Sequence, residues 1–336
     1  MNIEYVAQYG TSGYATAAKG NIQYLSNQGH NICFAPLKFD DSQIDKDWIV
    51  DQQVCSKMTP LSKYDVQIYH TIPNLWNMIK PKVKKDYYTK QIGYCTWETQ
   101  RIPPNWITEI NKLDELWVPS TFNQTYFAAS GVIIPITIFP HIFFDQIPPS
   151  KESVCLKDYR ARIIPNNKFT FYCIAELVDR KGIVDLLDTY IRFNEKYNIN
   201  QLLLKLHYKN YGAENIKYVE ETIKQYGDNV YLISKNITNK ELLEIHSLGD
   251  CYVSLHRGEG FGLSLYDAVN YKKKIIATNY GGPTDYLVKP HHLINYHMAG
   301  DWAYPDLGQV ATSMEFLSLC RQKTQVSLDL GMNGDQ

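Results

Sequence analysis

The stretch HRGEGFGLSLYDAVN, residues 256–270, contains a glycine-rich turn suited to binding a phosphate. Gly258 and Gly260 would let the backbone turn sharply at the end of a strand. Gly262 is expected to begin a helix, so the backbone N–H groups of Phe261, Gly262 and Leu263 would have no partner within that helix. These donors and the positive end of the helix dipole would attract an anion.

Two acids flank this expected phosphate site. Glu259 lies just before the helix start, where its carboxylate can accept hydrogen bonds from sugar hydroxyls. Asp267 lies on the polar side of the expected helix, roughly 7–8 Å along the axis from Gly262. At that distance from a bound phosphate, an acid reaches the hydroxyls of a ribose. The spacing therefore predicts a nucleotide-sugar, with its diphosphate between the sugar and the ribose.

The elements that would position these residues follow from the pattern of apolar runs. Short strand-like runs alternate with helical patterns along most of the chain, as in residues 169–198, where FTFYCIAELV precedes an amphipathic helix. Such alternation predicts an α/β fold with parallel sheets and helices on both faces. Ligands of these sheets bind beyond the carboxyl ends of the strands.

A stretch rich in proline, serine and charge interrupts this alternation and predicts two domains. We expect a Rossmann-like domain at 1–145, a linker at 146–167, and a second Rossmann-like domain at 168–336. The two parallel sheets are expected to face a cleft between the domains. The length of 336 residues also favours two domains of ordinary size.

Composition excludes several classes of protein. The net charge is −1, which gives no general attraction to nucleic acid. The N-terminal residues lack a secretory pattern, and no apolar run is long enough to span a membrane. We therefore expect a cytoplasmic protein. The seven cysteines form no Cys-x-x-Cys pair and are expected to be small buried side chains in a reducing compartment.

The order of several motifs resembles the retaining glycosyltransferases of family 4, which have the two-domain GT-B fold. The resemblance spans about residues 2 to 317 and rests on the Glu-x7-acid pattern with its Gly-Phe-Gly-Leu. It also rests on GTSGYATAA (10–18), on the long stretch from GYCTWETQR to FAASGV (93–132), and on IAELVDRKGIVDLL (174–187). DWAYPDLGQVATSM (301–314) is similar to a late helix start in one branch of the family.

The resemblance implies a role for each matching residue. Arg180 and Lys181 would neutralise the leaving diphosphate, Glu259 would hold the donor sugar, and Asp267 would bind the ribose. The family usually has Glu where this chain has Asp267, which shortens the reach by one methylene. Many members have Arg where this chain has Glu176, so Arg180 and Lys181 would have to suffice for the phosphates.

The N-terminal half would contribute further contacts. By the same resemblance, Gly10 and Gly13 would let the backbone of the first glycine loop approach the diphosphate. Glu98 and Arg101, in TWETQR, would contact the acceptor or the sugar. His70, His141 and Trp97 are interpreted as structural residues instead.

The resemblance implies an enzyme, most simply a hexosyltransferase that transfers a sugar with retention of configuration. The donor would be a nucleotide-diphosphate sugar, and the acceptor a glycan, a glycolipid or a protein-linked glycan in polysaccharide or glycoconjugate biosynthesis. Cations and helix dipoles would stabilise the leaving diphosphate, so neither a metal, another cofactor nor a protein nucleophile is expected. Three alternatives stay open: a nucleotide-sugar epimerase, a phosphorylase, and a non-catalytic carbohydrate- or nucleotide-binding relative.

Two further stretches have a weaker functional interpretation. The lysines between Lys80 and Lys90 could bring the protein to an anionic membrane surface that carries a lipid-linked acceptor. Asp45 and Asp47 form an Asp-x-Asp pair, but no apolar strand precedes them, so a solvated loop is expected there and not a metal site.

Overall fold

The computed structural model describes residues 1–8, 10, 12–37, 63–76, 88–142, 168–208, 213–226 and 229–331. The chain forms two compact units. Unit 1 consists of Met1–Asp145 together with the short segments Glu259–Leu263 and Gly281–Asp285, and unit 2 consists of the other residues. The linker expected at 146–167 lies outside the described residues, so the domain boundaries stay a prediction.

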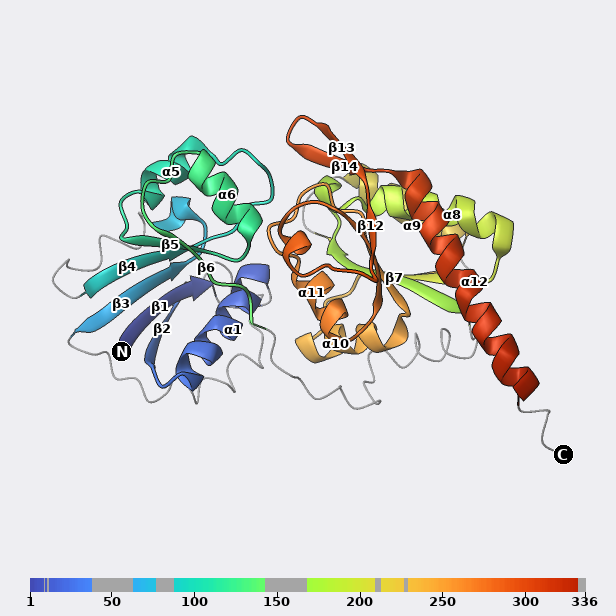
Figure 1. The fold of residues 1–336 in the computed structure, drawn as a ribbon, viewed down its shortest axis with the longest axis horizontal. Helices are drawn as coiled ribbons and strands as arrows, with labels where there is room; N and C mark the ends of the chain where they lie inside the picture. The colour runs from blue at the N-terminus through green and yellow to red at the C-terminus, as the bar shows by residue number, and fades with distance from the viewer. Residues whose placement is uncertain are drawn as a thin grey trace. The chain divides into compact units, whose positions relative to one another are not determined.

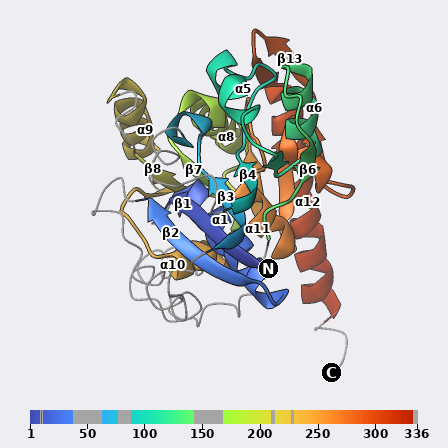
Figure 2. The same cartoon turned by 90° about the vertical axis from the view of Figure 1, so that its left-hand side faces the viewer.

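Unit 1 contains a six-stranded parallel sheet in the order β2-β1-β3-β4-β5-β6 (Figure 1). Strand β1 (Asn2–Gln8) lies between β2 (Asn31–Leu37) and β3 (Tyr64–His70). Figure 2 shows β1 and β2 side by side. The sheet continues through β4 (Tyr88–Tyr94), β5 (Glu115–Val118) and β6 (Ile136–Ile138). All five pairings are parallel, so the strands end at one edge of the sheet.

Helices cover both faces of this sheet. Helix α1 (Gly13–Asn27) packs Ala18, Ile22 and Leu25 against one face. Helices α5 (Pro104–Ile110) and α6 (Thr121–Ala129) pack Trp106 and Phe127 against the other face. Local sequence sets where these helices begin, because serine side chains cap α1 and α6 and proline opens α5.

Unit 2 contains a second six-stranded parallel sheet, in the order β12-β11-β10-β7-β8-β9. Its central strands are β7 (Phe169–Glu176), β8 (Asn200–His207) and β10 (Cys251–Ser254). Its outer strands are β9 (Val230–Ile233), β11 (Lys274–Thr278) and β12 (His292–Ile294). These pairings are also parallel throughout.

Each face of the second sheet has its own set of helices (Figure 1). Helices α8 (Ile183–Tyr197), α9 (Ala213–Gln225) and α12 (Leu307–Gly331) contribute side chains to the core on one face. Helices α10 (Asn239–Leu248) and α11 (Leu263–Asn270) contribute to the core on the other. The alternation in the sequence thus produces the expected α/β layers.

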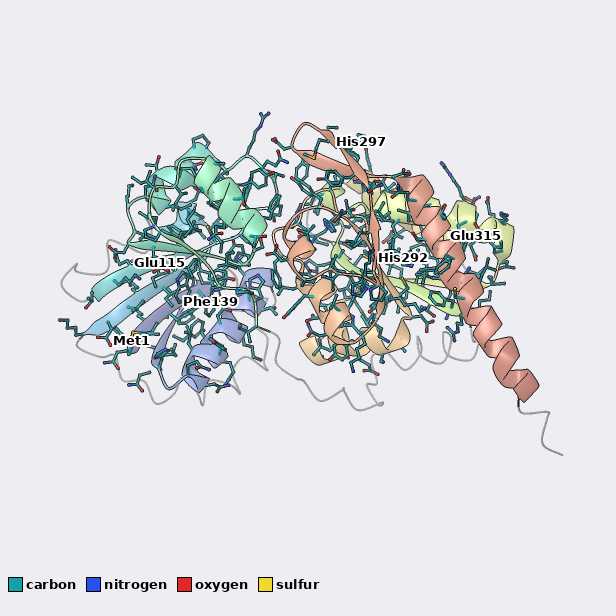
Figure 3. The ribbon with its side chains drawn as sticks, viewed as in Figure 1. Met1, Glu115, Phe139, His292, His297 and Glu315 are labelled. Atoms are coloured by element: carbon teal, nitrogen blue, oxygen red, sulfur yellow. The ribbon has the colours of Figure 1, made fainter. Side chains whose placement is uncertain are left out.

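A small antiparallel hairpin precedes α12 and was not expected from the sequence. It pairs β13 (Tyr296–Ala299) with β14 (Trp302–Pro305), and His297 lies on it (Figure 3). The resemblance predicted a helix start within DWAYPDLGQ, and α12 does begin there, at Leu307. The Asp306 side chain caps this helix, because it accepts hydrogen bonds from the N–H groups of Gly308 and Gln309 at 2.9 and 3.2 Å. The residues just before this cap form a strand.

None of the helices in the described part of the chain combines the length and the apolar character that crossing a membrane requires.

Candidate functional site

Most of the predicted site residues follow strands where the order of a sheet reverses. In unit 2, β7 and β10 are neighbours, and the chain proceeds outward from them in opposite directions. Arg180 and Lys181 follow β7, and Glu259 follows β10. In unit 1 the reversal lies between β1 and β3, and Gly10 follows β1. Ligands of doubly wound sheets bind in the crevice outside the carboxyl ends at such a switch point.

The turn after β7 carries the two cations. Arg180 and Lys181 lie in a short 3-10 turn, Asp179–Lys181, and both side chains are half-buried. Gly182 follows with φ of 62°, and a Cβ atom there would lie 2.2 Å from the carbonyl oxygen of Leu255. Only glycine fits this position, because the turns after β7 and β10 touch backbone to backbone.

Hydrogen bonds also join the turns after β7 and β10. The N–H of Arg257 donates to the carbonyl oxygen of Arg180 at 2.7 Å. In return, Nη1 of Arg180 donates to the carbonyl oxygen of Gly258 at 3.4 Å. The cationic turn is therefore fixed to the residue that immediately precedes Glu259.

The segment Glu259–Leu263 packs within unit 1. The N–H of Gly282 donates to the carbonyl oxygen of Glu259 at 2.9 Å, and a Cβ atom at Gly281 would lie 2.4 Å from the same oxygen. The hydroxyl of Ser120 donates to the carbonyl oxygen of Gly260 at 2.9 Å. These contacts hold the backbone around Glu259 and leave its carboxylate half-buried.

The residues expected to donate N–H groups lie at the start of α11. The helix begins at Leu263, one residue after the predicted start, and Gly262 has φ of 85°. Phe261 is buried and packs its ring edge-on against His141, with the ring centroids 4.7 Å apart. A Cβ atom at Gly13 would lie 3.8 Å from Cδ1 of Leu263, so the structure brings two of the predicted donor-binding residues together within unit 1.

The sequence placed Asp267 on the polar side of its helix, and the structure leaves this residue half-buried on α11. Removal of its carboxyl group from water raises the pKa of that group to about 7. The expected polar side of α11 is only partly solvated, because α11 contributes to the core against β10 and β11. This shift in pKa favours the protonated form of the Asp267 carboxyl.

The other predicted residues of unit 1 lie after β1 and β4. Gly10 is buried and has φ of 127°, whereas Gly13 is exposed at the start of α1. Glu98 is half-buried and Arg101 is exposed in the loop after β4. The indole N–H of Trp97 donates to the carbonyl oxygen of Arg101 at 2.7 Å, so Trp97 orders the backbone of this loop.

The two histidines interpreted as structural are buried in unit 1. The hydroxyl of Tyr5 lies 2.6 Å from Nδ1 of His70, and the hydroxyl of Tyr94 lies 3.1 Å from Nδ1 of His141. Burial lowers the pKa of His141 to about 3, and the negative charge of Glu259 partly opposes this shift. Both contacts stabilise neutral imidazole rings within the core.

Sequence reasoning missed one charged pair at the unit 2 switch point. Arg257 donates from Nη2 to the Asp185 carboxylate at 2.6 Å, and both side chains are mostly buried. Arg257 stands within the motif from which the prediction started. Its partner lies 72 positions earlier in the chain, and no spacing rule connects the two.

Two predictions fall wholly or mainly outside the described residues. Asp45, Asp47 and the lysines at 80–85 lie there, whereas Lys90 lies in β4 and pairs with Glu115. Over the described ranges, no three His, Cys, Asp or Glu side chains come close enough together to hold a metal ion.

Comparison with known proteins provides a family match for part of the chain. Residues 157–294 match the family described as glycosyl transferases group 1, which is less than half of the chain. No curated protein matches the chain significantly.

Similar solved structures cover more of the molecule. HepE from Anabaena, in complex with UDP-glucose, matches with a TM-score of 0.64 at 14% identity over 97% of this chain and 91% of that one. Sucrose-phosphate synthase from Thermosynechococcus elongatus matches with a TM-score of 0.65 at 14% identity, over 94% of this chain and 89% of that one.

A third similar structure is larger than this protein. It is a TarM variant from S. aureus in complex with Fondaparinux, alpha-GlcNAc-glycerol and UDP, with a TM-score of 0.55 at 15% identity. The match covers 74% of this chain and 47% of that one, so this chain spans about half the length of TarM. Together with the two parallel sheets, these similarities confirm the expected GT-B fold.

Proposed function

We propose that this protein is a glycosyltransferase that transfers a sugar from a nucleotide-diphosphate donor to an acceptor hydroxyl with retention of configuration. The observation that carries the proposal is the joined pair of turns at the unit 2 switch point. There, Arg180 and Lys181 follow β7, and hydrogen bonds connect their turn to the residues that lead into Glu259. Two cations in a turn bonded to the chain that leads into a carboxylate suit a ligand that has both a diphosphate and a sugar.

The cations would act on the leaving group. Negative charge builds on the diphosphate as its bond to the sugar lengthens, and fixed positive charges lower the free energy of that transition state. Arg180 and Lys181 lie in a rigid turn with little freedom to reorganise, because Gly182 packs against the Leu255 carbonyl. The start of α11 would add the N–H donors of Gly262 and Leu263 and the positive end of the helix dipole.

The two acids would bind opposite ends of the donor. Glu259 would accept hydrogen bonds from hydroxyls of the sugar, and its carbonyl oxygen is held by the N–H of Gly282 and lies against Gly281. Asp267 would bind the ribose in its ionised form. Because burial raises the pKa of Asp267 to about 7, hydrogen bonds from ribose hydroxyls would favour the charged form and compensate part of the cost of its burial.

Retention would follow if the acceptor hydroxyl attacks from the face that the diphosphate leaves. A departing phosphate oxygen would then take the acceptor proton, and no protein nucleophile would be required. The resemblance of the sequence supports this mechanism, and the group 1 family match supports glycosyl transfer in general. As proposed, the reaction relies on protein cations and backbone dipoles instead of a metal ion.

Donor binding is the first experiment. We expect one nucleoside diphosphate of a panel of five bases to raise the melting temperature, because a ligand that binds only the folded state stabilises it. Arg180→Ala should abolish that shift, and Lys217→Ala, which changes an exposed cation on α9, should preserve it. If no base gives a shift that depends on Arg180, the proposed diphosphate site is wrong.

Product analysis is the second experiment. The corresponding radiolabelled nucleotide-sugar should yield a glycoside whose anomeric proton coupling in the NMR spectrum matches that of the donor. An epimerised donor would instead indicate the epimerase alternative, and a sugar phosphate formed with inorganic phosphate would indicate the phosphorylase. Binding without any product would support a non-catalytic relative.

A further inference from the structure

We propose that Arg257 is the positioning residue of this site and that it holds the Glu259 turn in register with the cationic turn. The inference rests on the proposed function, which it deepens by naming a residue outside the predicted set. Arg257 lies two positions before Glu259 and contacts three other segments of unit 2. No other residue described here as part of the site joins so many elements.

The backbone of Arg257 links two of these segments. Its N–H donates to the carbonyl oxygen of Arg180 at 2.7 Å, and its carbonyl oxygen accepts from the N–H of Ala303 at 2.9 Å. The turn after β10 therefore lies hydrogen-bonded between the cationic turn after β7 and strand β14. If the backbone of Arg257 moved relative to the β7 turn and β14, both hydrogen bonds would break.

The side chain of Arg257 determines where this backbone lies. Nη2 donates to the Asp185 carboxylate in the first turn of α8, and the guanidinium carbon lies 4.5 Å from the ring centroid of Tyr304. The Nε atom is buried and has no hydrogen-bond partner among the described residues. The orientation of the guanidinium group thus depends on Asp185 and Tyr304, which hold it on two sides.

The same contacts separate Arg257 from the cations that would bind phosphate. Its positive charge is balanced by Asp185 at 2.6 Å, and the exposed fractions of the two side chains are 19% and 24%. Because the Asp185 carboxylate neutralises this charge, Arg257 would attract a diphosphate less strongly than an unneutralised cation would. The structure therefore assigns Arg257 to holding the turn and not to contacting the donor.

Unit 2 contains a matched pair that serves as a control. At the opposite edge of the same sheet, Arg321 donates to Asp250 at 2.5 Å and lies over the ring of Phe169 at 5.8 Å. Phe169 begins β7 and Asp250 immediately precedes β10, so this pair joins the same two strands at their amino ends. Both pairs have the same chemistry, but only the Arg257 pair adjoins the proposed site.

Hydrogen–deuterium exchange and kinetics of the full chain test the inference. Arg257→Gln and Asp185→Asn should each speed exchange in peptides covering 178–182, 257–263 and 302–305, relative to Arg321→Gln. With the donor that turns over, both variants should lower kcat by about 10- to 100-fold, because a small displacement of a reacting group has effects of that size. The KM for the donor should change by less than about threefold. Arg257→Lys, which keeps the charge next to Asp185, should recover part of kcat.

The outcomes distinguish this inference from the proposed function. If Arg257→Gln speeds exchange at 257–263 no more than Arg321→Gln does, Arg257 does not hold the turn. If exchange rises there but kcat stays at the wild-type value, the turn is held but does not position the reaction, and the inference also fails. If the wild-type protein transfers no sugar, the proposed function fails, and the exchange data alone decide whether Arg257 holds the turn. Asp185→Asn preserves side-chain size, so it supplies the same comparison if Arg257→Gln does not fold.

Discussion

The two units build similar sheets but place different chemistry where the strand order reverses. In unit 1 the chain adds β2 beside β1 and then continues from the other side of β1. In unit 2 it lays down three strands on one side of the sheet and three on the other, which is the order of dinucleotide-binding folds. Both orders leave a crevice at the carboxyl edge, so topology provides each unit with a potential binding position.

The residues at the two switch points differ in charge. The turn after β1 offers Gly10 and the cap residue Ser12, which carry no charge. The turns after β7 and β10 offer Arg180 and Lys181, together with Arg257, whose charge Asp185 balances. The two sheets therefore offer the same kind of position at the carboxyl edge, and the side chains at that position differ in charge. Four predictions test this difference.

The largest effect is expected from the cations of unit 2. Replacing Arg180 and Lys181 together by Ala should lower kcat by about 1000-fold, because both charges proposed to stabilise the leaving group would be lost. Replacing Lys112, an exposed cation of unit 1 paired with Glu109, should leave kcat unchanged. Steady-state kinetics with the identified donor provide the measurement. A fall of less than about tenfold in the double variant would show that charge at this switch point does not drive the reaction.

The second prediction concerns the backbone contact that joins the two turns of unit 2. Gly182 and Gly300 both have φ of 62°, but a Cβ atom would meet the Leu255 oxygen at the first position and nothing within 4 Å at the second. Gly300→Ala should cost about 1–2 kcal/mol of unfolding free energy, from the left-handed conformation alone. Gly182→Ala should cost about 2 kcal/mol more, because the two turns must separate.

Urea denaturation measures both glycine variants. Equal losses of unfolding free energy would mean that the β7 and β10 turns can move apart freely, and the rigid framework proposed for unit 2 would then be wrong.

The sequence predicted the layers of both units because local patterns determine them. Apolar runs alternating with amphipathic stretches indicate strands and helices, and the spacing of Ile183, Leu186 and Tyr190 correctly predicted that one face of α8 is buried. The positions of Arg180, Lys181 and Glu259 at strand ends followed from the same patterns. The order of strands in each sheet did not follow, because periodicity gives no information about which strands are neighbours.

The parts of the site that the sequence did not reveal depend on distant contacts. Arg257 pairs with Asp185, and the surroundings that raise the pKa of Asp267 form only when α11 packs on the sheet. The hairpin of β13 and β14 was missed because all four residues of β13 are exposed, so this strand has no alternation of buried and exposed side chains. The resemblance of DWAYPDLGQVATSM to a late helix start correctly predicted the start of α12, where Asp306 accepts from the N–H of Gly308.

The third prediction uses the buried acid of unit 2. The carboxyl group of Asp267 has its pKa raised from 3.8 in a model compound to about 7 in the folded protein. Between these values the folded state binds more protons than the unfolded state, so the stability contributed by this group falls as the pH rises from about 4 to 7. Above about pH 7 both states are ionised and the loss is complete.

Asp267→Asn should remove this pH dependence. Its unfolding free energy should equal that of the wild type near pH 4 and exceed it by about 2 kcal/mol at pH 8, after allowance for partial solvation. Its affinity for the nucleoside diphosphate should nevertheless fall, since an amide accepts fewer hydrogen bonds from ribose. Denaturation at both pH values and titration with the ligand measure the two effects. A variant that is less stable than the wild type at pH 8 would contradict the raised pKa.

The smallest effect compares the buried tyrosine–histidine pairs of the two units. The hydroxyl of Tyr5 accepts from Asn21 at 3.3 Å and lies 2.6 Å from Nδ1 of His70, so two polar side chains contact it. In unit 2 the hydroxyl of Tyr172 lies 2.9 Å from Nδ1 of His246. Tyr5 therefore has two hydrogen-bond partners where Tyr172 has one in the described structure.

Replacing each of these tyrosines by Phe should reveal that difference. Tyr172→Phe should cost about 1 kcal/mol, the usual net value of one hydrogen bond. Tyr5→Phe should cost about 2 kcal/mol, because both Asn21 and His70 would be left with unmet polar groups in the core. Thermal denaturation at pH 7 keeps both histidines neutral, since burial lowers the pKa of His246 to about 3 and that of His70 well below its usual value. Equal costs would mean that the Asn21 contact contributes no stability, and the polar core of unit 1 would then resemble that of unit 2.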